Sequence, residues 1–157
     1  MGYHEEKQRQ LDMRYIRMAK IWAENSYCIR RQVGALIVKD KMIISDGYNG
    51  TPSGFENICE DEVTGKTKPY VLHAEANAII SAARRDMIGG TLYLVGRDAA
   101  TGALLHDTTS CAMCRRMIIN SGITRVVNRI GDDGIEIIDV QNWIVNDESI
   151  QPKAEAE

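Results

Sequence analysis

The sequence predicts an α/β fold, a three-layer α/β/α sandwich in which a mixed sheet of about five strands lies between helices. Three observations predict it: an amphipathic stretch near the N-terminus, two β-branched runs around a short turn, and a helix–strand alternation in the second half. A strand–helix–strand connection joins parallel strands, whereas a short turn joins antiparallel ones. The sheet is therefore expected to contain both kinds of pairing.

The expected elements follow from local patterns along the chain. Apolar residues recur with helical spacing between Leu11 and Trp22 and predict a helix over 10–26. Runs of β-branched residues over 33–39 and 42–46 predict a hairpin. The later elements are expected as a helix over 73–87, a strand over 91–95, a helix over 111–121, and strands over 123–127 and 135–140.

Two segments, 48–69 and 97–109, carry no periodic pattern and are expected as long loops. Loops of this length in a compact domain are commonly functional or disordered. No linker or internal repeat is visible. One domain is therefore expected over 1–157, with a core over about 10–140 and a frayed C-terminal tail.

The composition narrows the class of protein. Of 157 residues, 44% are hydrophobic and 26% are charged, which is typical of a globular chain and excludes a disordered one. The net charge of -3 argues against a dedicated nucleic-acid binder. Neither a membrane-spanning run nor a signal-peptide pattern is seen, so we expect a cytoplasmic protein without membrane contact. Its four cysteines are then expected to stay reduced.

Chemistry-bearing residues stand at the starts of two expected helices. His73 opens one, and Cys111 and Cys114 open the next. One His and two Cys form a zinc ligand set with one position left open, the pattern of catalytic sites, and the helix dipoles are expected to ease deprotonation of both thiols. Zinc lowers the pKa of a bound water toward ~7. Glu75, two residues from His73, is expected to act beside the metal as acid and base.

The pairing of H-x-E with C-x-x-C resembles the zinc nucleobase deaminases of the cytidine deaminase superfamily. The matching residues are HAEANAI at 73–79 and CAMC at 111–114, and Ser110 stands where the family usually has Pro. Residues 28–54 are similar to the N-terminal half of deoxycytidylate (dCMP) deaminases, with C-x-R-x-x-V-G-A followed by G-Y-N-G-x-P-x-G.

This resemblance implies a cytidine deaminase-like fold and hydrolytic removal of the 4-amino group of dCMP, which gives dUMP and ammonia. It implies one Zn²⁺ held by His73, Cys111 and Cys114, with Glu75 protonating N3 and passing a proton to the leaving amine. It also implies a small nucleotide as the ligand and a homo-oligomer, either a hexamer or a dimer.

The same motifs also imply which residues contact the substrate. Asn49 would bind the sugar, and the backbone N–H of Ala74 would meet the base carbonyl. Arg30 matches the family's Arg and is expected to bind the phosphate, since phosphate favours Arg, with a contribution from Ser53.

Several departures keep alternatives open. The 97–109 segment looks inserted beside the metal site, so the substrate could be another small nucleobase, nucleoside or nucleotide. A non-catalytic, zinc-stabilised binding module is a further alternative, although such a module has no use for Glu75. An editing deaminase acting on tRNA or DNA fits poorly with the acidic charge. Cys28 and Cys59 nearly match a pair that holds a second zinc in some relatives, but no nearby Cys or His completes four ligands.

Overall fold

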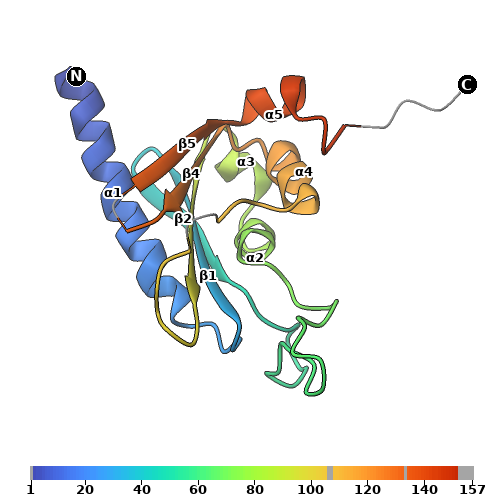
Figure 1. Cartoon of the computed structure of the whole chain (residues 1–157). Helices are drawn as coiled ribbons and strands as arrows, with labels where there is room; N and C mark the ends of the chain where they lie inside the picture. Colours follow the sequence, from blue (N-terminus) through green and yellow to red (C-terminus); the bar gives the residue numbers. More distant parts are fainter. Residues whose placement is uncertain (1, 106–107, 133, 152–157) are drawn as a thin grey trace, which may run out of the picture.

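The computed structural model describes residues 2–105, 108–132 and 134–151, so most of the tail that the sequence predicts to be frayed lies outside them. The elements in chain order (Figure 1) are α1 (Tyr3–Ala23), β1 (Arg31–Lys39), β2 (Met42–Tyr48), α2 (Ala74–Ile80), α3 (Arg84–Met87), β3 (Thr91–Asp98), α4 (Ala112–Ser121), β4 (Arg125–Ile130), β5 (Gly134–Asp139) and α5 (Val140–Asn146).

A five-stranded mixed sheet in the order β2-β1-β3-β4-β5 forms the middle layer. β1 pairs antiparallel with β2 and β3, β3 and β4 are parallel, and β5 is antiparallel to β4. The register places Gly47, Ala35 and Leu94 side by side across three strands. The predicted mixed sheet and its hairpin are confirmed.

Helices cover both faces of the sheet, as Figure 1 shows. On one face α1 places Ile16 and Ala19 against an apolar surface formed by Leu36, Tyr93 and Val127. On the other face α2 and α4 bury Ala78 and Ile118 against Ile37, Leu94 and Val126. The predicted three-layer α/β/α arrangement is therefore confirmed. Within the described residues, none of the helices combines the length and apolar character that a membrane crossing requires.

The prediction of a single helix over 73–87 is wrong, because this segment forms two helices, α2 and α3. The hydroxyl of Ser81 donates a hydrogen bond of 2.7 Å to the Asn77 carbonyl four residues earlier. Such a bond competes with the helical ladder and bends the chain. Ala83 then adopts an extended conformation before α3 begins.

Other boundaries also differ from the sequence prediction. α1 begins at Tyr3 rather than at residue 10. The sequence did not predict α5, although Asp139 caps it by accepting a 3.0 Å hydrogen bond from the Gln141 N–H.

The expectation that all four cysteines are reduced is wrong for Cys28 and Cys59, which form a disulfide with their Cα atoms 5.2 Å apart. The loop between β2 and α2 folds back over the residues before β1 and brings the two sulfurs together. Cys111 and Cys114 are free thiols.

A close approach of helix to strand fixes α2 on the sheet. A Cβ atom at Gly47 of β2 would lie 2.5 Å from the Ala74 carbonyl oxygen and 2.6 Å from the Ala78 nitrogen. On the opposite face, a Cβ at Gly34 would overlap the Ala19 carbonyl of α1. Glycine at these two positions therefore permits both helices to pack directly on the strand backbones.

Gly47→Ala is expected to lower the free energy of unfolding by roughly 1–3 kcal/mol, because the added methyl group must push α2 off the sheet. Urea denaturation measures the change. Gly2→Ala is the matched control, since a Cβ there meets nothing within 4 Å. Equal denaturation midpoints for wild type and Gly47→Ala would contradict the close approach.

A buried ion pair between Asp12 and Arg125 joins α1 to β4. Asp12 is fully buried, and one of its oxygens accepts hydrogen bonds from Tyr93 Oη at 2.6 Å and Arg125 Nη1 at 2.8 Å. Burial alone would raise the pKa of Asp12, but hydrogen bonds from Arg125, Tyr93 and Gln8 outweigh it and hold the pKa below the ordinary value of 3.8. The carboxylate therefore stabilises the fold above the unfolded-state pKa, and this contribution is lost as the pH falls through the folded-state pKa.

Asp12→Asn is expected to lower the free energy of unfolding near pH 7 by roughly 3 kcal/mol, because Arg125 loses its charged partner. The difference from wild type is expected to shrink as the pH falls below about 4, because the carboxylate of the unfolded state is then protonated, and to shrink further as the pH approaches the lower folded-state pKa. Urea denaturation at a series of pH values measures both effects. The exposed Asp46→Asn serves as control, and a difference that does not change with pH would contradict the assignment.

Candidate active site

Three ligand atoms from two helix starts meet beside the sheet. His73 directly precedes α2, and its Nδ1 lies 3.4 Å from the sulfur of Cys111 and 3.4 Å from that of Cys114. All three atoms lie within 4.8 Å of one another. Cys111 caps α4, and its sulfur accepts a hydrogen bond from the Cys114 N–H. The fold thus brings together the ligands that the sequence predicts.

The donor set fits a metal ion of the zinc type, because one imidazole nitrogen and two sulfurs are ligands that zinc prefers. Burial raises the pKa of Cys114, and the negative charges of Glu75 and Cys111 raise it further. Burial and these charges thus oppose the easing of deprotonation that the helix start provides. A divalent cation between the sulfurs would reverse this effect, since it favours the thiolate.

Glu75 lies in the first turn of α2 and is buried, with 4% of its surface exposed. It borders the same pocket as His73 and Cys111. Ala74 also borders this pocket, and its N–H belongs to the first residue of α2, where the helix offers no carbonyl partner. A carboxylate and an N–H that has no hydrogen-bond partner among the described residues therefore border the metal end of the pocket.

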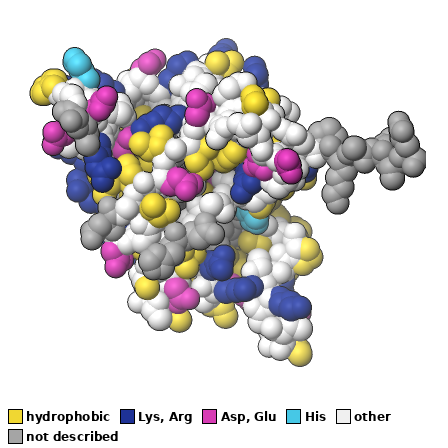
Figure 2. Space-filling model, turned by 45° about the horizontal axis from the view of Figure 1, so that its top comes forward, with side chains coloured by type: hydrophobic (Ala, Val, Ile, Leu, Met, Phe, Trp, Pro, Cys, Tyr) yellow, Lys and Arg dark blue, Asp and Glu magenta, His cyan; other side chains and the backbone are white. Residues whose placement is uncertain are grey.

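The pocket has a volume of about 370 Å³, a size common for small-molecule sites. Val33 and Leu94 from the sheet give it an apolar floor, and Arg30 and Arg31 line it at the start of β1. Arg31 lies four residues along β1 from Ala35, the partner of the Gly47 on which the start of α2 packs, so the two arginines lie toward the end away from the helix start that carries His73. On the face that Figure 2 shows, several Lys and Arg side chains lie near a histidine side chain. The pocket is therefore apolar in the middle and carries metal ligands at one end and positive charge at the other.

Asn49 also borders the pocket, and its amide is already oriented by β1. Its Oδ1 accepts a 2.8 Å hydrogen bond from the Val33 N–H, and its Nδ2 donates one of 2.8 Å to the Arg31 carbonyl. One N–H and one lone pair remain for a ligand. Ser53, by contrast, is exposed and does not border this pocket.

Sequence reasoning placed the 97–109 segment beside the metal site but did not name Leu105 and Thr108, and it named Arg30 rather than Arg31 as the phosphate contact; all of these residues line the pocket. A Cβ at Gly96 would lie 2.8 Å from Thr108 Oγ1 and 2.9 Å from Leu105 Cδ1, so both side chains cover this glycine. A glycine inside a strand often marks such an approach, and Gly96 is the signal that could have found them. Thr108 Oγ1 is buried without a hydrogen-bond partner among the described residues, so it is available to a ligand.

The start of the loop predicted over 97–109 is wrong, because β3 continues to Asp98. After Asp98 the chain turns back along the end of β3. The Asp98 N–H donates to the Ala103 carbonyl, and the Leu105 N–H donates to the Gly96 carbonyl at 2.9 Å. We call residues 96–105 the wall hairpin. The Ala99 N–H also donates to the Arg30 carbonyl, so the wall hairpin contacts the positively charged end of the pocket.

An α/β/α sandwich that presents His and two Cys ligands beside a buried Glu defines the class of zinc nucleobase deaminases. The model of the family described as "Cytidine and deoxycytidylate deaminase zinc-binding region" matches residues 9–129. The chain belongs to this cytidine and deoxycytidylate deaminase family.

Named relatives agree with this assignment. The deoxycytidylate deaminase of Mycobacterium phage D29 is 34% identical over 129 residues, which cover 74% of this chain and 91% of the phage protein. That of Saccharomyces cerevisiae is 33% identical, but this chain spans only 36% of its length. The crystal structure of dCMP deaminase from cyanophage S-TIM5 in complex with dCMP and dUMP is 32% identical, with a TM-score of 0.61 and coverage of 82% of this chain and 83% of that one.

Cys114→Ser is expected to reduce bound zinc well below one ion per chain, because it removes one of three ligands. Removing zinc from the wild type should also lower its stability, by about 3 kcal/mol relative to zinc at a hundred times its Kd. Metal analysis and thermal unfolding with and without a chelator measure these effects. Met113→Gln, at an exposed position of the same motif, is the control, and a Cys114→Ser protein that retains zinc as tightly as wild type would contradict the ligand set.

Proposed function

We propose that this protein is a zinc-dependent hydrolytic deaminase that converts dCMP and water to dUMP and ammonia. The observation that carries the proposal is the buried Glu75 beside the His73, Cys111 and Cys114 ligand set, in a pocket whose opposite end is lined by two arginines. The relatives named dCMP deaminase support this substrate.

The mechanism follows from the positions of these groups. Zn²⁺ held by His73, Cys111 and Cys114 would supply Lewis acidity that activates water for attack. Glu75 takes one proton from the attacking water and delivers it to N3 of the base, then takes the second proton from the hydroxyl group added at C4 and passes it to the amine, which departs as ammonia. The N–H of Ala74 donates to the base carbonyl, and the apolar floor formed by Val33 and Leu94 excludes competing water from the ring.

The far end of the pocket suits the phosphate. Arg30 and Arg31 both line it, and guanidinium groups bind phosphate oxygens through paired, charge-assisted hydrogen bonds. Asn49, between this end and the metal ligands, has one N–H and one lone pair for the sugar. Ser53 stays a prediction as a phosphate contact.

A second candidate is deamination of another small nucleobase, nucleoside or nucleotide. Leu105 and Thr108 favour it, because they bring to the pocket an apolar side chain and a buried hydroxyl that has no hydrogen-bond partner within the described part of the chain. Ammonia release from cytosine, cytidine, deoxycytidine, CMP, dCMP and their purine counterparts distinguishes the two candidates. A single catalytic domain over 1–157, a cytoplasmic location and a homo-oligomer stay predictions of the sequence.

Glu75→Gln is expected to fold, to bind zinc and to lose at least about a hundredfold in kcat, because the amide cannot carry protons between water, ring and amine. Ammonia release from dCMP measures the loss, and metal analysis checks the zinc. Glu62→Gln, an exposed change in the loop between β2 and α2, should have wild-type activity. Equal activity of Glu75→Gln and wild type would contradict the proposed role, and a wild type inactive on every compound would favour the binding module.

A further inference from the structure

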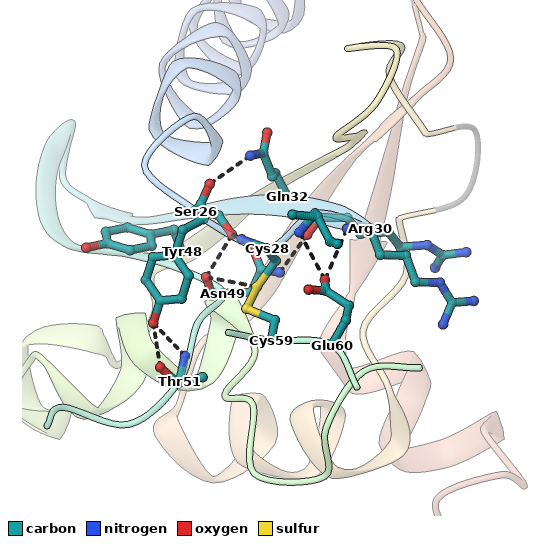
Figure 3. The surroundings of a disulfide bond; sticks show 12 residues. Ser26, Cys28, Arg30, Gln32, Tyr48, Asn49, Thr51, Cys59 and Glu60 are labelled. Carbon is teal, nitrogen blue, oxygen red and sulfur yellow. Dashed lines mark hydrogen bonds between the residues drawn. A yellow bond between two sulfur atoms is a disulfide. The ribbon is translucent and has the colours of Figure 1, made fainter. Parts of the chain in front are cut away.

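The segment before β1 is tied to the loop between β2 and α2 through side chains (Figure 3). The Ser26 hydroxyl donates a 2.9 Å hydrogen bond to the Asn49 carbonyl, and the Tyr27 hydroxyl lies 2.7 Å from Thr51 Oγ1. Further along, the Cys28–Cys59 disulfide joins the same two segments. Side chains thus hold these two stretches of chain together.

Glu60 adds a second attachment directly beside the disulfide. One of its carboxylate oxygens accepts a 3.0 Å hydrogen bond from the Ile29 N–H and one of 3.1 Å from the Arg30 N–H. Glu60, Cys28 and Cys59 are exposed by 6%, 3% and 1%, respectively. We call the disulfide and the Glu60 carboxylate together the clamp. Because a buried carboxylate with two N–H donors is strongly oriented, the clamp fixes the backbone of residues 28–30.

The clamp lies at the positively charged end of the pocket. Arg30 receives the Glu60 contact through its own N–H, and Arg31 is held through its carbonyl by Asn49. Both arginine side chains line the pocket and are themselves exposed. Among the described residues, neither guanidinium group has a hydrogen-bond or salt-bridge partner, so the backbone of residues 30 and 31 decides from where these side chains reach into the pocket. In the described part of the chain, the clamp contacts neither Glu75 nor the three metal ligands.

We propose that the clamp positions Arg30 and Arg31 for the 5′-phosphate and so sets the preference for a nucleotide over a nucleoside. Glu60 is then a positioning residue, and the preference responds to thiol reductants. This inference rests on the proposed function, because it concerns the phosphate end of the same pocket. A nucleoside uses the metal end and the apolar floor but has no phosphate for the arginines.

The redox step needs a dithiol as reductant. One thiolate of the dithiol attacks a sulfur of the Cys28–Cys59 bond and forms a mixed disulfide, and its second thiolate then displaces that cysteine. Two electrons and two protons pass to Cys28 and Cys59, which become thiols, while the reductant becomes an intramolecular disulfide. The loop must open for this attack, since both sulfurs are buried.

The first measurement counts thiols in the zinc-loaded full chain, purified without reductant and then denatured. Two of the four cysteines are expected to react, Cys111 and Cys114. Four reactive thiols would overturn the disulfide and with it the redox response. Three or more reactive thiols would also overturn the disulfide and the redox response if mass analysis showed no cross-link between Cys28 and Cys59.

The second measurement compares kcat/KM for dCMP and deoxycytidine. Glu60→Ala is expected to raise KM for dCMP about tenfold, equivalent to about one charge-assisted hydrogen bond, while leaving deoxycytidine within about twofold. Glu60→Gln should recover most of the preference, because its carbonyl oxygen still accepts both N–H groups. Glu62→Gln, an exposed neighbour in the same loop, should leave the ratio unchanged. An equal loss for both substrates in Glu60→Ala would overturn the positioning role.

The redox part is tested on the wild type and on the Cys28→Ser/Cys59→Ser double variant. Dithiothreitol should reduce the dCMP preference of the wild type to that of the double variant and should not change the double variant itself. A reductant effect of equal size on the double variant would place the action at the zinc ligands and overturn the proposal. The measurement on the wild type needs no substitution, so its result is valid even if a variant fails to fold.

Failure of the proposed function is recognisable separately. A zinc-loaded wild type that releases ammonia from neither dCMP nor deoxycytidine contradicts the deaminase proposal. In that case the role of the clamp is tested by measuring the binding of dCMP and of deoxycytidine by calorimetry. A dCMP-to-deoxycytidine affinity ratio that is unchanged in Glu60→Ala would overturn it.

Discussion

The contact between α2 and the backbone of β2 at Gly47 is the constraint on which the site depends. With no side chain between them, the helix start is held at a fixed height above the sheet, and His73, Ala74 and Glu75 are held with it. α4 packs beside α2 on the same face and brings Cys111 and Cys114 to His73. The ligand set is therefore a consequence of helix packing on a shared sheet.

The middle of the chain was predictable because its signals are local. Alternation of strands and helices specifies the layers, and His73, Cys111 and Cys114 stand at helix starts that their own neighbours predict. The division of the second helix was not predictable in this way, because it depends on which acceptor the Ser81 hydroxyl chooses. Likewise, nothing in the spacing of Cys28 and Cys59 shows that the chain after β2 returns to the residues before β1.

The pocket walls were the least predictable part of the site. Arg31, Leu105 and Thr108 reach the pocket from segments without periodicity, through contacts made only after the chain has folded. Asn49 was predicted from a motif, yet the structure gives its amide a second role in aligning the start of β1. Ser53 belongs to the same motif, but it is exposed and is not among the residues that line the pocket.

The wall hairpin is closed at its base by backbone hydrogen bonds between Gly96 and Leu105 and between Asp98 and Ala103. Its tip can therefore lengthen, shorten or change sequence while the strand beneath keeps its pairing and the core keeps its packing. Natural variation at this position would reshape one side of the pocket at little cost to stability. The fold thus has a built-in place where substrate range can diverge between related proteins while the catalytic centre is inherited intact.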